Sequence, residues 1–194
     1  MKVLVLRNAN TSVIDVIKQG GDNVIDTSES IDKCYVEKNG VNFIVSHGYR
    51  HIINHQVINI LKERVINLHI SHLPWNRGAD PNLWSFLEDT PKGVSIHYVD
   101  QGIDTGDTII QRELFFNEEK ETLESTYQKL QNEMIQLFKT HWPLIKEGTC
   151  QRMKHPADGS YHKSSDKKKF EYLLSKGWDT PVIELKGKAI SHGQ

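Results

Sequence analysis

Residues 42–68, NFIVSHGYRHIINHQVINILKERVINL, place an apolar run, a helical pattern and a second apolar run in succession. The runs NFIVS and VINL are short and continuous, which is typical of buried strands. Between them, Val57, Ile60 and Leu61 recur at the spacing of one helix face. This order of strand, helix and strand predicts two parallel strands joined by a crossover helix.

The same alternation extends toward the N-terminus. Val3–Leu6 predicts a buried strand, residues 11–19 predict a helix that stops at Gly20-Gly21, and Asn23–Asp26 predicts a weak strand. Residues 28–40 are polar and rich in turn-forming residues, so we expect no regular element there.

Toward the C-terminus, Pro81–Glu88 predicts a short helix, and Gly93–Asp100 with Asp107–Glu113 predicts a hairpin with a long loop. Glu121–Ile145 predicts a long amphipathic helix with a core-facing apolar stripe, and a last helix is expected near 167–176. The predicted fold is therefore α/β and Rossmann-like. Its mostly parallel central sheet is flanked by helices and followed by a C-terminal hairpin and long helix, in one domain over 1–194.

Composition excludes several broad classes of partner. The 194 residues carry 24 Lys and Arg against 25 Asp and Glu, a formal charge of −1 that offers no general attraction for nucleic acid or anionic membranes. No apolar stretch approaches the ~20 residues of a membrane span, and the N-terminal apolar run is too short for a signal peptide. Cys34 and Cys150 lack metal-type spacing, so we expect two reduced thiols in a cytoplasmic protein.

The common phosphate-binding and acyl-transfer motifs do not occur. The first predicted strand is followed by NANTSV and not by GxGxxG or a P-loop, which disfavours an ordinary dinucleotide or nucleotide triphosphate enzyme. No GxSxG nucleophile elbow is present either.

Two polar residues, one in the strand VINL and one just beyond it, lie closely enough to act together. Asn67 and His69 are separated by one residue at the end of that strand, so both side chains can point to the same side. Open α/β sheets bind ligands at this edge. An amide donor beside an imidazole suits a reaction that forms a tetrahedral oxyanion. The alternative is that Asn67 caps a turn and His69 is a half-buried structural histidine.

Asp104 is the third candidate, in the loop Gln101-Gly102-Ile103-Asp104-Thr105-Gly106-Asp107. A carboxylate near His69 would favour the imidazolium and determine which ring nitrogen carries hydrogen. Alternatively, Asp104 is an Asx-turn residue of the hairpin.

We expect no metal. Three histidines, His69, His72 and His97, have no carboxylate at a zinc-site spacing, and the HExxH pattern is absent. The acidic residues of the hairpin loop also miss the spacing of a calcium loop.

Three segments in order resemble the folate-dependent formyltransferases: VSHGYRHIINHQV, then NLHISHLPWNRGADPNLW, then KGVSIHYVDQGIDTGDTIIQ. The resemblance covers about residues 42–115, and the N-terminal 41 residues are shorter than is usual in that family. It implies transfer of a formyl group from 10-formyltetrahydrofolate, a co-substrate, to a primary amine. The catalytic residues of the family fall on Asn67, His69 and Asp104, and a histidine that orients them falls on His97.

The resemblance also implies the folate contacts, largely through backbone groups: Tyr49, Arg50, His51, Ile52, Val99, Asp100, Gln101, Gly102 and Ile103. The family usually has Pro-Ser-Leu after the catalytic histidine, whereas this chain has Ile70-Ser71-His72. A cis peptide is expected at Leu73-Pro74, as in the family.

The form RGADPxxW and the late GSYHK segment resemble most closely the sugar N-formyltransferases and the formylation domain of some nonribosomal peptide synthetases. Methionyl-tRNA formyltransferases carry an additional C-terminal β-barrel domain, which we do not expect here. The expected acceptor is thus the amine of a nucleotide-linked amino sugar. The alternatives are glycinamide ribonucleotide, or a catalytically silent relative that binds folate or sugar.

An acceptor with a pyrophosphate needs cationic and aromatic groups. The expected acceptor contacts follow the catalytic motif and recur in the C-terminal tail: Trp75, Asn76, Arg77, Tyr161, His162 and Lys163. The alternative for both sets is structural, with Trp75 in the core and residues 159–166 in an exposed turn.

Overall fold

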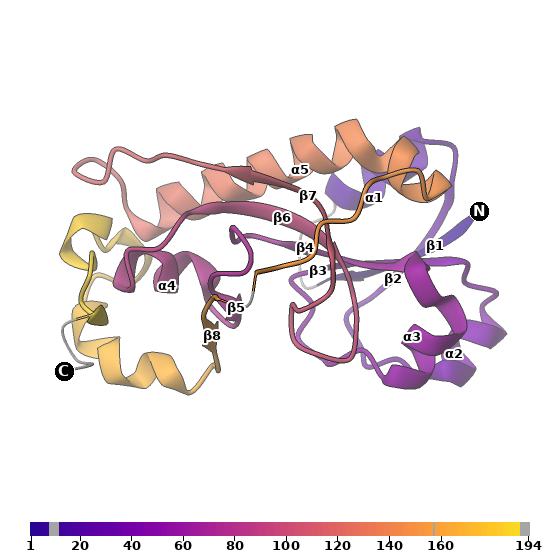
Figure 1. The fold of residues 1–194 in the computed structure, drawn as a ribbon, viewed down its shortest axis with the longest axis horizontal. Helices are drawn as coiled ribbons and strands as arrows, with labels where there is room; N and C mark the ends of the chain where they lie inside the picture. The colour runs from indigo at the N-terminus through magenta and orange to yellow at the C-terminus, as the bar shows by residue number, and fades with distance from the viewer. Residues whose placement is uncertain (8–11, 157, 191–194) are drawn as a thin grey trace. The chain divides into compact units, whose positions relative to one another are not determined.

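The computed structural model describes residues 1–7, 12–156 and 158–190 (Figure 1). The chain divides into two compact units. Unit 1 comprises Met1–His69, Ile96–Ile110 and Met134–Lys154, and unit 2 comprises Ile70–Ser95, Gln111–Glu133 and His155–Gln194. In the described ranges, no helix has the length and apolar character needed to cross a membrane.

The central sheet contains the predicted parallel strands. β1 (Lys2–Arg7) pairs in parallel with β2 (Asn23–Thr27) and β3 (Phe43–His47), and β3 pairs in parallel with β4 (Val65–His69). The order of the six strands is β2-β1-β3-β4-β6-β7. The expectation of a mostly parallel, Rossmann-like α/β sheet is therefore confirmed.

The last two strands form the predicted hairpin. β6 (Gly93–Tyr98) and β7 (Thr108–Glu113) follow one another in the sheet order. The Tyr98 backbone N–H donates to the Asp107 carbonyl oxygen at 3.0 Å, next to the loop that joins the strands. This loop, residues 99–107, returns the chain past the end of β6 and carries Asp104.

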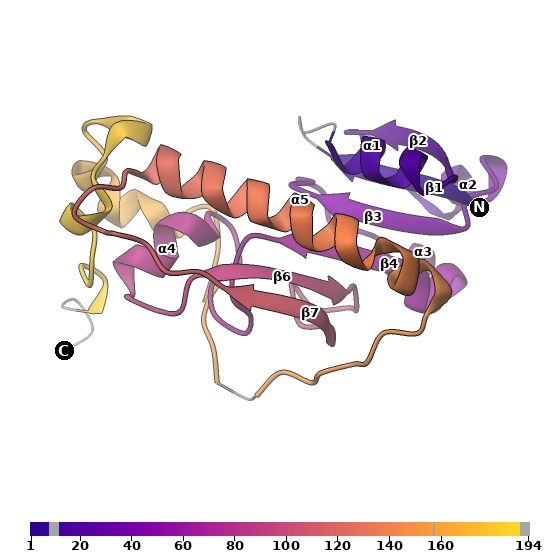
Figure 2. The ribbon, with the colours of Figure 1, turned by 90° about the horizontal axis from the view of Figure 1, so that it is seen from above.

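Helices cover both faces of the sheet in unit 1 (Figure 1). α1 (Ser12–Gln19) and the C-terminal half of α5 (Leu123–Glu147) lie on one face, and α2 (Lys33–Lys38) and α3 (His55–Leu61) lie on the other. Figure 2 shows α1 over β1 and β2 from a second direction. The predicted helix over 11–19 is present from Ser12, and Thr11 lies outside the described residues.

The helix α2 corrects the expectation that 28–40 has no regular element. Asp32 caps this short helix, because its side-chain oxygen accepts a hydrogen bond from the Tyr35 backbone N–H at 2.7 Å. Val36 is its one buried side chain. Six residues with one apolar anchor give no periodic pattern that the sequence could reveal.

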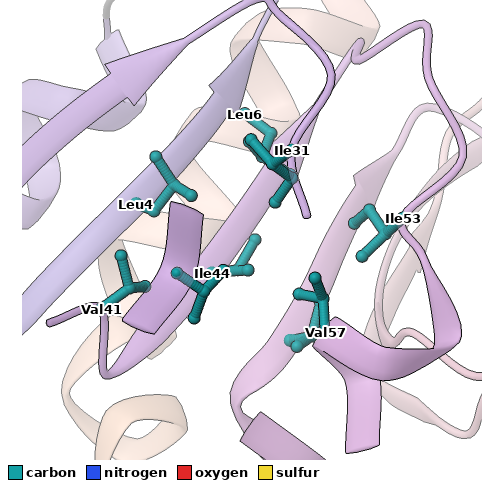
Figure 3. Close-up of a cluster of buried hydrophobic side chains, with 9 residues drawn as sticks. Leu4, Leu6, Ile31, Val41, Ile44, Ile53 and Val57 are labelled. Carbon is teal, nitrogen blue, oxygen red and sulfur yellow. The ribbon is translucent and has the colours of Figure 1, made fainter. Parts of the chain in front are cut away.

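The core between the sheet and α2 and α3 consists of aliphatic side chains (Figure 3). Leu4, Ile44 and Val65 come from three neighbouring strands, and Val36 and Val57 come from the two helices. Burial of such side chains contributes roughly 1.5–3 kcal/mol each, so this layer holds the strand ends in place.

The sheet face opposite α2 and α3 packs against the apolar stripe of α5. Trp142 is 1% exposed, and its ring meets Phe43 of β3 edge-on at 5.2 Å between centroids. The indole Nε1 also donates to Asp22 Oδ2 at 3.2 Å. The prediction that the stripe makes core contacts is confirmed by six buried residues: Leu123, Leu130, Met134, Phe138, Trp142 and Ile145.

Trp142→Ala is expected to lower the free energy of unfolding by about 3–5 kcal/mol, because it removes the largest fully buried side chain and leaves a cavity. Trp142→Phe retains most of the buried ring and loses the hydrogen bond to Asp22, so a loss of about 1 kcal/mol is expected. Urea denaturation followed by circular dichroism measures both. Equal stability of the two variants would contradict this assignment of the α5 stripe.

Unit 2 has a separate apolar cluster built on α4 (Pro81–Leu87), in which Trp84, Phe86 and Leu87 are buried. Two short parallel strands, β5 (Arg77–Gly78) and β8 (Tyr161–His162), form a second sheet that sequence periodicity cannot predict at this length. The last helix, expected near 167–176, is instead a 3₁₀ helix over Asp166–Leu173, with Phe170 as its only buried residue.

The remaining elements of unit 2 are the 3₁₀ turns Gly177–Asp179 and Val182–Glu184. The peptide bond Leu73-Pro74 is cis, as expected.

Candidate active site

Four polar side chains of unit 1 meet beside the end of β4. Asn67 and His69 come from β4, His97 comes from β6, and Asp104 comes from the loop after β6. His69 and His97 are buried, and the side chain of Asp104 is 13% exposed. We call these four residues the polar cluster.

Asn67 links two members of the polar cluster. Its Nδ2 lies 3.1 Å from Asp104 Oδ1 and 3.3 Å from His97 Nε2. A carboxylate oxygen only accepts hydrogen bonds, so the NH₂ group of Asn67 must face Asp104. His97 Nδ1 lies 2.8 Å from the Tyr98 carbonyl oxygen, so Nδ1 carries hydrogen and Nε2 of a neutral ring accepts from Asn67. One amide group therefore joins the carboxylate to the imidazole.

Asp104 lies between the two imidazoles. Its Oδ2 is 3.7 Å from His69 Nε2, and its Oδ1 is 3.4 Å from His97 Nε2. The cluster therefore brings a carboxylate, an amide N–H group and two imidazoles together at one place. Among residues 1–7, 12–156 and 158–190, no group of three or more His, Cys, Asp or Glu is arranged to hold a metal ion.

The loops predicted to contact folate expose apolar side chains. Ile52, after β3, is 81% exposed, and Ile103, next to Asp104, is 43% exposed. A cavity of about 560 Å³ in unit 1 is lined by Val99, Asp100 and Gln101 of the second loop, together with residues of α3. This volume is in the range of small-molecule sites.

Two of the predicted folate residues have internal roles that the sequence did not reveal. The Tyr49 hydroxyl donates to the Glu29 carbonyl oxygen at 2.7 Å, and burial raises the pKa of this phenol. Asp100 Oδ1 accepts from the Gly102 backbone N–H and the Thr105 hydroxyl. Arg50 and His51 are exposed.

In unit 2, the two sets of residues expected to contact the acceptor lie together. β5 and β8 pair with Arg77 opposite Tyr161 and Gly78 opposite His162. Gly78 has φ +89°, and a Cβ there would lie 2.9 Å from the Tyr161 ring and 2.3 Å from the His162 carbonyl oxygen. The close approach of the two strands therefore requires glycine at 78. Tyr161 is 41% exposed beside it.

Asn76 and His162 stabilise this small sheet. Asn76 is fully buried, and its Nδ2 donates to Thr90 Oγ1 at 2.9 Å while its backbone N–H donates to Ser160 Oγ at 3.0 Å. The His162 ring stacks on Trp84 at 3.7 Å, and its Nε2 lies 3.2 Å from Glu88 Oε2. Burial opposes ionisation of Glu88, but hydrogen bonds from His162 and Ser160 outweigh it and lower the pKa of this carboxyl.

The family model for formyl transferases matches residues 3–140, which include the polar cluster and both exposed loops. The chain belongs to the formyl transferase family. The resemblance noted in the sequence is thereby confirmed for the family and the fold.

Two proteins of known structure are similar to this chain and are also formyltransferases. The formyltransferase PseJ from Anoxybacillus kamchatkensis is 49% identical over 97% of this chain and 100% of that one, with a TM-score of 0.93, and its crystal contains UDP-4,6-dideoxy-4-formamido-L-AltNAc and tetrahydrofolate. A 4-N formyltransferase from Francisella tularensis is 25% identical over 87% of this chain and 78% of that one, with a TM-score of 0.75.

Cytosolic 10-formyltetrahydrofolate dehydrogenase of Xenopus laevis is 30% identical over 119 residues, which are 60% of this chain. The match spans 13% of that dehydrogenase, so only a small part of the relative corresponds to this formyl transferase chain.

In unit 2, His72 has a polar neighbour. Gln111 Nε2 lies 2.8 Å from His72 Nε2 and donates to the Leu73 carbonyl oxygen at 3.2 Å. Burial lowers the pKa of His72. The His72 side chain is thus held beside the Leu73-Pro74 turn and is not a member of the polar cluster.

Proposed function

We propose that this chain transfers a formyl group from 10-formyltetrahydrofolate to the primary amine of a nucleotide-linked amino sugar. The observation that carries the proposal is the polar cluster, in which one amide joins Asp104 to His97 and Asp104 lies 3.7 Å from His69. The 49% identity to PseJ, whose crystal contains tetrahydrofolate and a UDP-linked formamido sugar, supports the two substrates.

In the reaction proposed, the neutral amine of the acceptor attacks the formyl carbon. The new C–N bond forms as the carbonyl oxygen becomes an oxyanion, and the bond from carbon to folate N10 then breaks. When the substrates bind, Asn67 Nδ2 turns one of its two N–H groups from Asp104 to the oxyanion, and a protonated His69 donates a second hydrogen bond to it. Each such donor in a buried site contributes roughly 3–4 kcal/mol to the stability of the transition state.

The proton balance assigns a role to Asp104. The attacking amine becomes an ammonium and must lose a proton, whereas the departing folate nitrogen must gain one. Asp104 lies within reach of Asn67, His69 and His97, so it can accept the proton directly or through water and return it to N10. His97 orients Asn67 through the 3.3 Å contact between Nε2 and Nδ2.

Folate would bind against the loops of unit 1. The exposed side chains of Ile52 and Ile103 offer apolar surface to a pteridine, and their burial by a ligand is favourable. Backbone groups would hold its polar edge. The residues proposed for this site are Tyr49, Arg50, His51, Ile52, Val99, Asp100, Gln101, Gly102 and Ile103.

The acceptor would contact the β5–β8 sheet of unit 2. Tyr161 presents a partly exposed ring, and the cationic side chains of Arg77 and Lys163 suit a diphosphate. Trp75 is half-buried just before Arg77. Asn76 and His162 would support these contacts indirectly. Both are buried, Asn76 donates to Thr90, and His162 stacks on Trp84.

Residues 1–194 would act as one catalytic domain on small molecules and not on nucleic acid, consistent with a formal charge of −1. A cytoplasmic location is in keeping with the two free thiols, Cys34 and Cys150.

A panel of acceptors tests the proposal. The protein is incubated with 10-formyltetrahydrofolate and UDP-linked 4-amino sugars, dTDP-linked amino sugars or glycinamide ribonucleotide. We expect kcat/KM for a UDP-linked 4-amino sugar to exceed that for glycinamide ribonucleotide by at least about 100-fold. Exclusive use of glycinamide ribonucleotide would instead assign the chain to that reaction.

A further inference from the structure

The loop that carries Asp104 has its own internal bracing. Asp100 Oδ1 accepts a hydrogen bond from the Gly102 backbone N–H at 3.0 Å and another from the Thr105 hydroxyl at 2.6 Å. One carboxylate oxygen therefore ties the first half of the loop to the residue that follows Asp104. All of these residues belong to unit 1.

Asp104 itself needs support from its surroundings. Its φ is +53°, in the left-handed region that residues other than glycine adopt at an energetic cost. A free loop would relax toward the more common conformations, and the carboxylate would leave its position near Asn67 and His97.

The glycines on either side of Asp104 show how tightly the loop closes. A Cβ on Gly102 would lie 2.0 Å from Thr105 Oγ1, and a Cβ on Gly106 would lie 1.9 Å from the Tyr98 carbonyl oxygen. Both distances are far below a van der Waals contact. The Asp100–Thr105 hydrogen bond thus closes a loop in which the Thr105 side chain fills the space beside Gly102 and the Tyr98 backbone fills the space beside Gly106.

We propose that Asp100 and Thr105 are positioning residues that hold the Asp104 carboxylate against Asn67, His69 and His97. The role in catalysis rests on the proposed function, whereas the geometric role does not. Asp100 is exposed, so its contribution comes from the two hydrogen bonds it accepts and not from a buried charge. An asparagine oxygen can accept the same bonds.

We call the two hydrogen bonds that Asp100 Oδ1 accepts the brace. The first test measures the kinetics of Asp100→Ala, which removes both hydrogen bonds, and of Thr105→Val, which removes the one that closes the loop after Asp104. We expect kcat to fall on the order of 10- to 100-fold, the scale of a small misplacement of a catalytic group, with a smaller change in the KM for folate. Thr105→Ser keeps the hydroxyl donor and should retain most of the activity, and Asp100→Asn keeps an oxygen acceptor, so its kcat should exceed that of Asp100→Ala. The double variant Asp100→Ala/Thr105→Val should be no worse than Asp100→Ala, because Asp100→Ala already removes the hydrogen bond from Thr105.

The second test follows the position of the Asp104 carboxylate and does not depend on enzyme activity. The ring ¹H–¹³C resonances of His69 and His97 are recorded at one pH for the wild type, Asp104→Ala, Asp100→Ala and Thr105→Val. Loss of the brace should move these resonances in the direction seen for Asp104→Ala, since the same carboxylate leaves both rings. Asp32→Ala is the matched control, because it removes a carboxylate that accepts a backbone N–H elsewhere in unit 1.

The two tests separate the two claims. Unmoved histidine resonances in Asp100→Ala and Thr105→Val would overturn the brace even if the wild type transfers formyl groups. Moved resonances in a protein with no transferase activity would support the brace and reject the proposed function. If Asp32→Ala moves the same resonances equally, the effect is a general loss of stability and the brace is rejected.

Discussion

The Asp104→Ala protein is expected to lose formyl transfer by about 1,000-fold, while its affinity for tetrahydrofolate stays within a few-fold of that of the wild type. The carboxylate is the acceptor of the amine proton in the proposed reaction and contacts Asn67, His69 and His97. The folate loops are proposed to bind largely through backbone groups, which alanine leaves in place. Single-turnover kinetics measures the first effect and isothermal titration calorimetry the second.

Asp104→Asn is the matched control for this experiment. Its amide oxygen still accepts a hydrogen bond from Asn67 Nδ2, so the local geometry is retained while the charge and the proton acceptor are lost. It should lose nearly as much activity as Asp104→Ala. Turnover by either variant close to that of the wild type would contradict the role of the carboxylate.

Replacing Asn67 with alanine has the second largest expected effect, a fall in kcat on the order of 100- to 1,000-fold with little change in the KM for folate. The side chain supplies a donor to the oxyanion, and its loss also leaves His97 Nε2 and Asp104 Oδ1 without their shared partner. Stopped-flow measurement of the tetrahydrofolate released gives the rate.

Asn67→Asp keeps the shape of the side chain and replaces the donor with an acceptor, placing a second carboxylate about 3.1 Å from Asp104 Oδ1. Two carboxylates at that range oppose ionisation of both. We expect a loss at least as large as that of Asn67→Ala, with a pH profile shifted toward higher pH. If kcat depends only on the size of residue 67 and not on its donor, the oxyanion role is rejected.

The parallel core of the fold was predictable because its strands are buried on both faces. β1, β3 and β4 are continuous apolar runs, and the helix between β3 and β4 shows Val57 at a core-facing position. The elements that were missed have little apolar content. α2 buries only Val36, and β5 and β8 have two residues each, so none of them produces a period.

Part of the polar cluster was predictable because it lies at the end of a recognisable buried strand. Asn67 and His69 stand at alternate positions at the end of a buried strand, and Asp104 lies in a glycine-rich loop. Contacts between segments far apart in the sequence were not predictable. Trp84 stacks on His162, which lies 78 positions further along the chain. Glu88, the ion-pair partner of His162, carries no local sequence signal. The Asp100 brace could have been suspected from the Asx-turn spacing to Gly102, but not its bond to Thr105.

Transfer of a labelled formyl group tests the central claim most directly. The wild-type protein is mixed with 10-[¹³C-formyl]tetrahydrofolate and a UDP-linked 4-amino sugar, and the label is followed by ¹³C NMR. The predicted result is a formamide resonance that grows as the donor resonance falls, with one formamide formed for each tetrahydrofolate released. Folate binding without any formamide, or label released only as formate, would contradict the proposed transferase.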